Sequence, residues 1–264
     1  MYKYIDEKGQ HLHTMDGRPL VGTSTALKVL AKVLTWWASG LACAHLGWSK
    51  KRENTEEARK TRAEARLKTI KGMTTEQYLE TLDTAYKAHT VKLDSSADKG
   101  IELHAELERF VKWKMKSQER GLEEEAVGFS PRIAPFIEWT NKNVERFIAS
   151  EAHCFSIEFW LGGICDCIAR LKNGTIAIVD FKSAKIAYED HFLQCAGYAI
   201  QIDENGICDR NGENTRKLGE KIGELVVFPF GAKTVAAHTR LDVERLKTGY
   251  KHVVALYKLI ILKQ

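Results

Sequence analysis

The chain has 264 residues, which is enough for one large domain or two small ones. Hydrophobic residues make up 44% and charged residues 28%, which excludes wholesale disorder, and four prolines with nineteen glycines exclude a collagen-like or low-complexity protein. The net charge of +5 suits a polyanionic partner without requiring one. No uncharged stretch reaches the ~20 apolar residues that span a bilayer, and the N-terminus lacks a signal-like apolar run. We therefore expect no membrane partner and a cytoplasmic location.

The first half of the chain is predicted to be mainly helical. Residues 2–14 could form a short hairpin, and Thr74 with Gln77 resembles a capping box that opens a helix. Helices are predicted, in chain order, over residues 24–48, 54–70, 74–89, 95–116 and 131–148. The first of these is apolar and the second is charged nearly all round.

The character of the sequence changes after Ser150. Strands are predicted over residues 151–160, 164–171, 175–183, 222–230 and 234–240, with a helix over 188–200 and a polar loop over 203–219. The last helix carries one apolar stripe that runs from Val243 to Ile260. The fold class is therefore α/β or α+β, with a mixed central β-sheet flanked by helices. We expect a single domain over 1–264, with a mainly helical part (1–149) and a sheet-containing core (150–264).

The hairpin over residues 162–185 is the most informative part of the sequence. A three-residue turn at 172–174 with its glycine in the left-handed conformation would place Asp166 directly opposite Asp180. Lys182, two residues further on, would share that face of the strand. A two-residue turn would instead pair Asp166 with Phe181 and separate the two aspartates. The prediction of a site depends on the first register.

Two opposed carboxylates repel each other, and the neighbouring residues of this hairpin are largely isoleucine. The pair is understandable if a divalent cation lies between them, and hard oxygen ligands favour Mg²⁺ or Mn²⁺. A lysine beside such an ion could orient or deprotonate a water for in-line attack on phosphorus. The alternative is an ordinary hairpin end with a surface ion pair between Asp180 and Lys182.

Several motifs follow one another along the chain in a recognisable order. They are Gly100–His104, Glu151, Gly163–Asp166, Asp180–Lys182 and Gln194–Tyr198, preceded by the segment 21–25 and the pair Trp36–Trp37. In this order and spacing they resemble the PD-(D/E)XK nuclease superfamily, and within it the RecB-like, phage-type exonuclease branch. The resemblance extends over most of residues 20–200 and implies the restriction-endonuclease-like core of that superfamily.

The resemblance also implies a role for each matching residue. Asp166 and Asp180 would be the principal metal ligands, with the Phe181 carbonyl as an additional one, and His104 would be a further ligand. Lys182 would position the nucleophilic water and stabilise developing charge. The remaining matches are Glu151, which would bind a second metal or steer a water, and Gln194 and Tyr198, which would hold the substrate backbone or brace the site.

Some of these positions have other interpretations. His104 could instead pair with Glu108 one helical turn away, Glu158 lies on the same segment as Glu151, and Tyr198 could belong to the core. Arg59, Arg62 and Arg66 share one helix face that could bind the DNA backbone, or they could belong to a solvated helix balanced by glutamates. Trp36 and Trp37 could stack on a terminal base or pack in the core.

The expected function is that of a metal-dependent deoxyribonuclease, an exonuclease acting at DNA ends in phage or bacterial recombination or repair. The expected cofactor is Mg²⁺ or Mn²⁺. The late cysteine triplet of iron–sulfur relatives is missing, so no iron–sulfur cluster is expected. The six cysteines are predicted to be free thiols, with Cys165 and Cys167 in the core. The expected partners are single- or double-stranded DNA ends and a single-strand annealing or recombination protein. The alternatives are a structure-specific or CRISPR-adaptation-like endonuclease, a non-catalytic DNA-binding module on the same fold, and a structural protein.

Overall fold

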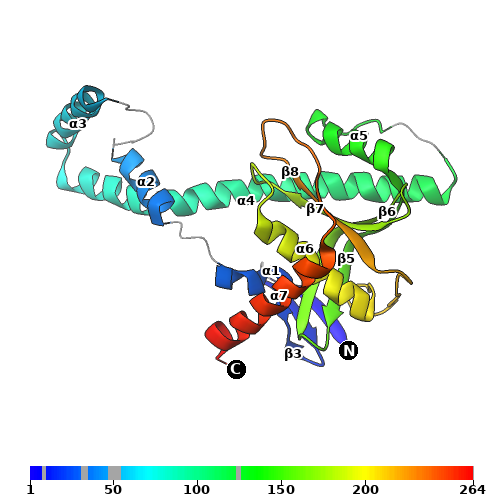
Figure 1. Cartoon of the computed structure of the whole chain (residues 1–264). Coiled ribbons are helices and arrows are strands. Elements are labelled where there is room, and N and C mark those ends of the chain that lie inside the picture. The colour runs from blue at the N-terminus through cyan, green and yellow to red at the C-terminus, as the bar shows by residue number, and fades with distance from the viewer. Residues whose placement is uncertain (8–9, 31–34, 47–54, 123–125, 264) are drawn as a thin grey trace. The chain divides into compact units, whose positions relative to one another are not determined.

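A computed structural model describes residues 1–7, 10–30, 35–46, 55–122 and 126–263 (Figure 1). The residues group into two compact units, where we had predicted one domain over 1–264. One unit comprises residues 32–99, and the other comprises residues 1–31 together with 100–264.

The unit of residues 32–99 is helical where it is described. It contains α2 (Thr35–His45), α3 (Glu56–Lys71) and the first part of the long helix α4 (Thr75–Glu119). The predicted capping box is confirmed, because Gln77 Oε1 accepts from the Thr74 backbone N–H at 3.0 Å and Thr74 Oγ1 accepts from the Gln77 backbone N–H at 3.3 Å.

The predicted helix break before residue 95 is wrong, because α4 continues without interruption to Glu119. Ser95 or Ser96 is a candidate helix start in the sequence, because serine is favoured at the N-cap. Serine is also accommodated in a helix interior when no glycine or proline interrupts the surrounding turns, and none lies between residues 75 and 99.

The other unit contains two sheets. The N-terminal sheet is β1 (Tyr2–Glu7), β2 (Gln10–Met15) and β3 (Arg18–Pro19), in that order, and its first two strands form the predicted hairpin. The central six-stranded sheet has the order β4-β6-β7-β8-β9, with β5 paired to β6. Its strands are β4 (Val21–Gly22), β5 (Val144–Ser156), β6 (Leu161–Leu171), β7 (Ile176–Lys182), β8 (Ile222–Pro229) and β9 (His238–Arg240). The β4–β6 and β7–β8 pairs are parallel and the others are antiparallel, so the sheet is mixed.

The β6–β7 hairpin has the register that the first turn predicts. Leu171 N–H donates to Thr175 at 2.8 Å, Gly174 adopts a φ of +87°, and Ile168 lies opposite Ile178. Continuing this register past the last paired residues, Cys167 and Val179, brings Asp166 and Asp180 to the same level.

Helices cover both faces of the central sheet (Figure 1). On one face, α6 (Glu189–Asn205) and α7 (Val243–Tyr257) bury an apolar cluster that includes Ile168 and Ile178. On the other face, the C-terminal part of α4 and α5 (Ala134–Asn143) bury a second cluster that includes Phe181. The chain is thus a mixed α/β protein with a mixed sheet flanked by helices. None of the described helices is long and apolar enough to span a membrane.

Two helix boundaries differ from the prediction. The helix expected over 24–48 is described as α1 (Thr23–Ala26), the 3-10 helix η1 (Leu27–Leu30) and α2, and residues 31–34 and 47–48 lie outside the described residues. The helix after Pro131 begins with the 3-10 turn η2 (Pro131–Ile133) and ends at Asn143 rather than near 148. The next residues form β5 instead, because pairing with β6 buries Val144, Phe147 and Ile148.

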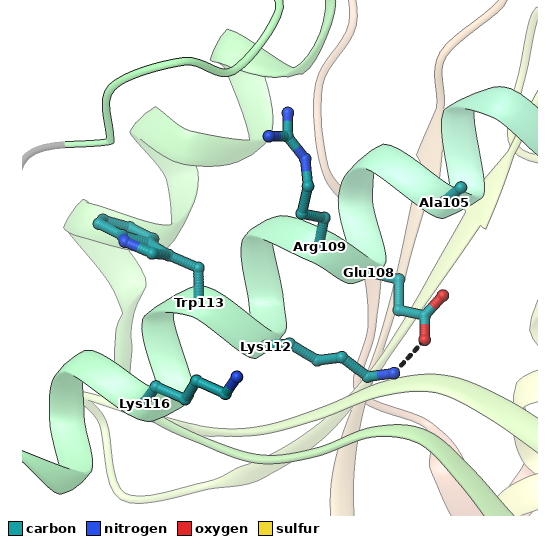
Figure 2. A pocket seen from close by; sticks show the side chains of 6 residues that line it. All are labelled: Ala105, Glu108, Arg109, Lys112, Trp113 and Lys116. Carbon is teal, nitrogen blue, oxygen red and sulfur yellow. Dashed lines mark hydrogen bonds and ion pairs between the residues drawn. The ribbon is translucent and has the colours of Figure 1, made fainter.

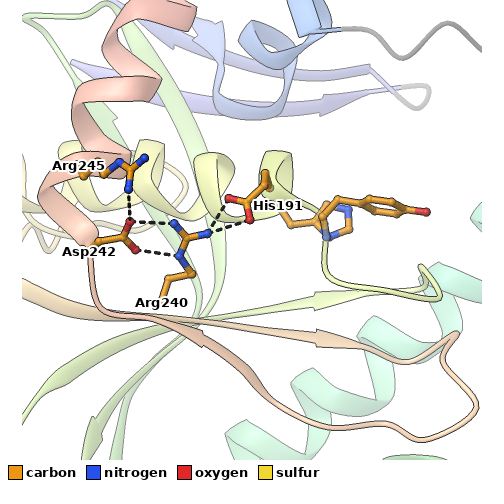
Figure 3. A network of polar contacts seen from close by, with 6 residues as sticks. His191, Arg240, Asp242 and Arg245 are labelled. Atoms are coloured by element: carbon orange, nitrogen blue, oxygen red, sulfur yellow. Dashed lines mark hydrogen bonds and ion pairs between the residues drawn. The ribbon is translucent and has the colours of Figure 1, made fainter.

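The apolar stripe of the last helix is confirmed up to Tyr257. Val243, Leu246, Tyr250, Val253 and Tyr257 are buried, whereas Ile260 is exposed in the π-helical turn η3 (Lys258–Leu262). An ion-pair network joins the starts of α6 and α7 to β9 (Figure 3). Arg240 binds Asp242 through two hydrogen bonds of 2.8 Å and Glu189 through two of 2.7 and 2.9 Å.

Candidate active site

The carboxylate of Asp166 lies where strands β6 and β7 separate. The β6–β7 ladder ends at Cys167, and at Leu161 and Gly162 strand β6 pairs with β4 instead. Between these two regions the Asp166 carboxylate accepts a hydrogen bond of 2.8 Å from the backbone N–H of Phe181. This bond holds Asp166 beside Asp180 although the two strands no longer form a ladder there.

Asp180 is a buried charged residue with few partners. Its side chain is 1% exposed, and Lys182 Nζ lies 2.6 Å from one of its oxygens as an ion pair. Neither oxygen receives a hydrogen bond of good geometry from the described residues. Burial raises the pKa of Asp180, with Asp166 adding to the rise and Lys182 opposing it. Burial acts to lower the pKa of Lys182, but the two aspartates outweigh it and raise that pKa.

Helix α4 brings His104 to the same site. His104 Nδ1 lies 3.7 Å from Asp166, and its ring meets the edge of Phe181 with 6.1 Å between centroids. The alternative partner Glu108 instead forms a hydrogen bond and ion pair with Lys112, one turn further along the helix. The structure therefore places His104 against the aspartates, as the sequence motif implies.

Glu151 lies at the site in an unusual backbone conformation. Ser150 pairs with Cys167 and Ala152 with Cys165, so Glu151 lies opposite Asp166. Its φ is +48°, a left-handed conformation that costs a non-glycine residue about 1 kcal/mol or more. Burial raises its pKa to about 8, with further contributions from Asp166 and Glu108. The competing candidate, Glu158, lies exposed beyond the end of β5.

Gln194 and Tyr198 lie on α6 one turn apart, with Gln194 Nε2 donating to the Tyr198 hydroxyl at 2.7 Å. Tyr198 is 6% exposed and its ring packs against Gly163, where a Cβ would lie only 2.7 Å from its Cε1. Burial raises the pKa of Tyr198, with Asp180 and Asp166 adding to it. The tyrosine is thus a core residue that also braces the strand carrying Asp166.

A buried polar network at the start of β6 was not found from the sequence. Thr23 donates to the Gly162 carbonyl at 3.1 Å and accepts from Gln201 at 2.7 Å, while the Tyr250 hydroxyl donates to the Thr23 carbonyl at 2.7 Å. Thr23 belongs to segment 21–25, which is part of the sequence resemblance. Nothing in the spacing links it to Gln201 or Tyr250, 178 and 227 residues away.

The predicted DNA-binding arginines belong to the other unit. Arg59, Arg62 and Arg66 lie on α3. Arg59 and Arg62 are exposed, whereas Arg66 is half-buried and donates to the His45 carbonyl at 3.3 Å. The side chains of Trp36 and Trp37 lie outside the described residues. No family model matches the chain, and no curated protein matches it.

The donor set of the site suits a hard cation. Asp166, Asp180 and Glu151 contribute three carboxyl groups, and the Asp180 oxygens are buried with Lys182 as their one charged partner in the described part of the chain. Among the described residues no three His, Cys, Asp or Glu side chains converge as a metal site. In this arrangement it is the Lys182 ammonium that lies against Asp180. All six cysteines are free, and Cys154, Cys165, Cys167 and Cys195 are buried.

Proposed function

We propose that the chain is a metal-dependent deoxyribonuclease with a PD-(D/E)XK-type core, which hydrolyses DNA phosphodiester bonds and acts at DNA ends. The observation that carries this proposal is the buried Asp180 carboxylate, which is 1% exposed, lies beside Asp166 and has the Lys182 ammonium 2.6 Å away as its one ion-pair partner among the described residues. Two neighbouring carboxylates share the single positive charge of Lys182, and a divalent cation bound there would offset the remaining cost of burying the second negative charge.

Each residue has a role that its position supports. Asp166 and Asp180, with the Phe181 carbonyl and His104, would hold Mg²⁺ or Mn²⁺. The bound ion would supply charge stabilisation of a phosphate oxygen and a more acidic water. Lys182 is close enough to the aspartates to orient the attacking water and to donate a hydrogen bond to the phosphate. Glu151, which lies opposite Asp166, would bind a second ion or orient a water.

The preference for DNA ends follows from the resemblance to the RecB-like, phage-type branch. The same resemblance supports a setting in phage or bacterial recombination or repair, with a single-strand annealing or recombination protein as a partner. A structure-specific or CRISPR-adaptation-like endonuclease would use the same residues, so only the substrate distinguishes the two. A non-catalytic DNA-binding module has no need for a buried aspartate pair with an adjacent lysine.

The experiment incubates the full chain with end-labelled linear DNA and with closed circular DNA, in Mg²⁺, in Mn²⁺ or in EDTA. We expect degradation of linear DNA alone, only in the presence of the metal. Asp180→Asn, which keeps the shape of the side chain, is expected to lower the rate about 100-fold or more. Glu158→Gln, which removes an exposed carboxylate outside the site, is the matched control and is expected to retain the wild-type rate.

Nicking of the closed circular DNA would show that the activity is that of an endonuclease and not of an exonuclease. Metal-independent binding of DNA without cleavage would support the non-catalytic module. If folded wild-type protein neither cleaves nor binds DNA, or if Asp180→Asn cleaves as fast as Glu158→Gln, the nuclease proposal is wrong.

A further inference from the structure

An open groove follows the surface of α4 in the turns beyond His104. Figure 2 shows its side chains succeeding one another along the helix. It is lined by Ala105, Glu108, Arg109, Lys112, Trp113 and Lys116. The spacing of three and four residues places all of them on one helix face.

The groove has an excess of positive charge. Its three cations outnumber the single carboxylate of Glu108, which gives a net charge of +2. Arg109 is fixed in place, because it donates to the Gly128 carbonyl at 3.0 Å and lies 4.5 Å from the centre of the Phe129 ring. Lys116 is exposed and has no partner among the described residues.

An aromatic ring lies between these charges. Trp113 is half-buried and packs against Phe110 and Phe129, which fixes its orientation. Trp113 also lines the groove, and Lys114 Nζ lies 5.9 Å from the centre of its ring. A fixed indole flanked by lysines can stack on an unpaired base while the ammonium groups contact the neighbouring phosphates. A duplex hides the faces of its bases inside the stack, so it cannot use the ring in this way.

The groove adjoins the candidate active site at one end. Ala105 follows His104 directly in α4. The charges of Glu108 and Lys112 both act on the pKa of Glu151, which lies opposite Asp166. The cationic residues therefore form a path along α4 that starts beside the carboxylates and leads away from them.

We propose that this groove of α4 binds a single-stranded segment of nucleic acid, with phosphates on Lys112 and Lys116 and a base on Trp113. The inference rests on the proposed nuclease function and specifies the substrate of the same site. The strand that leaves or enters the site would follow the helix from Glu108 towards Lys116. Binding here needs no divalent ion, because the protein supplies the positive charge.

The experiment measures the fluorescence anisotropy of labelled oligothymidylate of about 16 nucleotides in EDTA, at about 0.1 M salt. Lys112→Ala/Lys116→Ala is expected to bind about 25-fold more weakly than the wild type, because each lost phosphate contact contributes about 0.7 to the salt exponent. The slope of log K against log salt is expected to become less steep by about 1.4. Lys217→Ala/Lys221→Ala, which removes two exposed lysines before β8, is the matched control and is expected to bind as the wild type.

Two further probes test the base and the strand. An oligonucleotide of abasic sites keeps the phosphates and is expected to bind the wild type about 5-fold more weakly, because it has no base to stack on Trp113. A blunt duplex is expected to lose much less affinity than oligothymidylate when Lys112 and Lys116 are replaced. An equal loss for both probes would overturn the assignment to a single strand, and equal binding of the abasic probe would overturn the role of Trp113.

The outcomes separate this inference from the proposed function. If the wild type cleaves DNA with Mg²⁺ and Lys112→Ala/Lys116→Ala binds oligothymidylate as tightly as the lysine control, the groove assignment is wrong and the nuclease proposal stands. If the wild type neither binds nor cleaves any of the probes, both are wrong.

Discussion

Gly163 is a position where one added methyl group tests the packing that holds β6 against α1 and α6. A Cβ built there would lie 2.3 Å from Thr23 Oγ1 and 2.7 Å from Tyr198 Cε1. Both neighbours are buried, and Thr23 Oγ1 is already hydrogen-bonded to Gly162 and Gln201. Gly163→Ala must therefore displace a buried hydroxyl, a tyrosine ring or the strand itself.

The expected loss of stability follows from these contacts. Overpacking of a closely packed site costs about 1–3 kcal/mol, and disturbing one hydrogen bond of Thr23 adds about 1 kcal/mol. We expect Gly163→Ala to lower the free energy of unfolding by about 2–4 kcal/mol, measured by urea denaturation followed by circular dichroism. For a chain of this size the melting temperature is expected to fall by roughly 4–16 °C.

A matched glycine and a second substitution make this prediction specific. Gly100 lies inside α4 with Ser183 Oγ at 3.6 Å from a built Cβ, an ordinary contact, so Gly100→Ala is expected to stabilise the chain by about 1 kcal/mol. Thr23→Ala removes the closest clashing atom, so the cost of Gly163→Ala should fall by about 1 kcal/mol or more in that background. An equal cost in both backgrounds, or a Gly163→Ala protein as stable as the wild type, would refute the packing argument.

Two other buried polar residues give further predictions. Burial lowers the pKa of His13 from 6.5 to about 4, and His153 and His11 add to the effect. The unfolded chain therefore binds a proton before the folded chain does. The contribution of neutral His13 to the free energy of unfolding should be fully present above pH 6.5 and should fall by about 3 kcal/mol as the pH drops to about 4. In urea unfolding followed as a function of pH, His13→Phe should remove this decrease. Lys247 is 6% exposed and pairs with Asp203, so Lys247→Met should lower the free energy of unfolding by about 1–3 kcal/mol; a melting temperature equal to the wild type would contradict this.

Local chemistry made the hairpin register predictable. Residues 172–174 form the three-residue turn, in which Asn173 Oδ1 accepts from the Thr175 backbone N–H and Gly174 takes a positive φ. A turn of this type admits one register of β6 against β7. That register places Asp166 and Asp180 at the same level of the two strands. The capping box of α4 and the apolar stripe of α7 were predictable for the same reason, because each depends on residues within a few turns of one another.

Long-range pairing decided the features that the sequence did not predict. Residues 144–148 continue a helical pattern, yet they form β5 because pairing with β6 buries Phe147 and Ile148. The left-handed backbone of Glu151 has no local signal, since glutamate rarely adopts it. The contact of Thr23 with Gln201 requires the assembled sheet and helix. The pairing of β5 with β6 and the contact of Thr23 with Gln201 both join residues that are not neighbours in the sequence.

The assembled sheet also explains why the acidic residues can gather at one place. Along one edge, strand β6 pairs with β7 as far as Cys167 and with β4 only at Leu161 and Gly162. Asp166 therefore lies in the interval where neither β7 nor β4 is paired with β6. In that interval Phe181 N–H is free to bind the Asp166 carboxylate, and Glu151 faces it from β5 in a strained conformation. In a regular ladder the backbone N–H of Phe181 would bind a carbonyl of the neighbouring strand and could not donate to the Asp166 carboxylate. The apolar clusters on both faces of the sheet must offset the free-energy cost of the strained Glu151 backbone and the neighbouring carboxylates. A locally destabilising arrangement within a well-packed sheet is typical of a functional site.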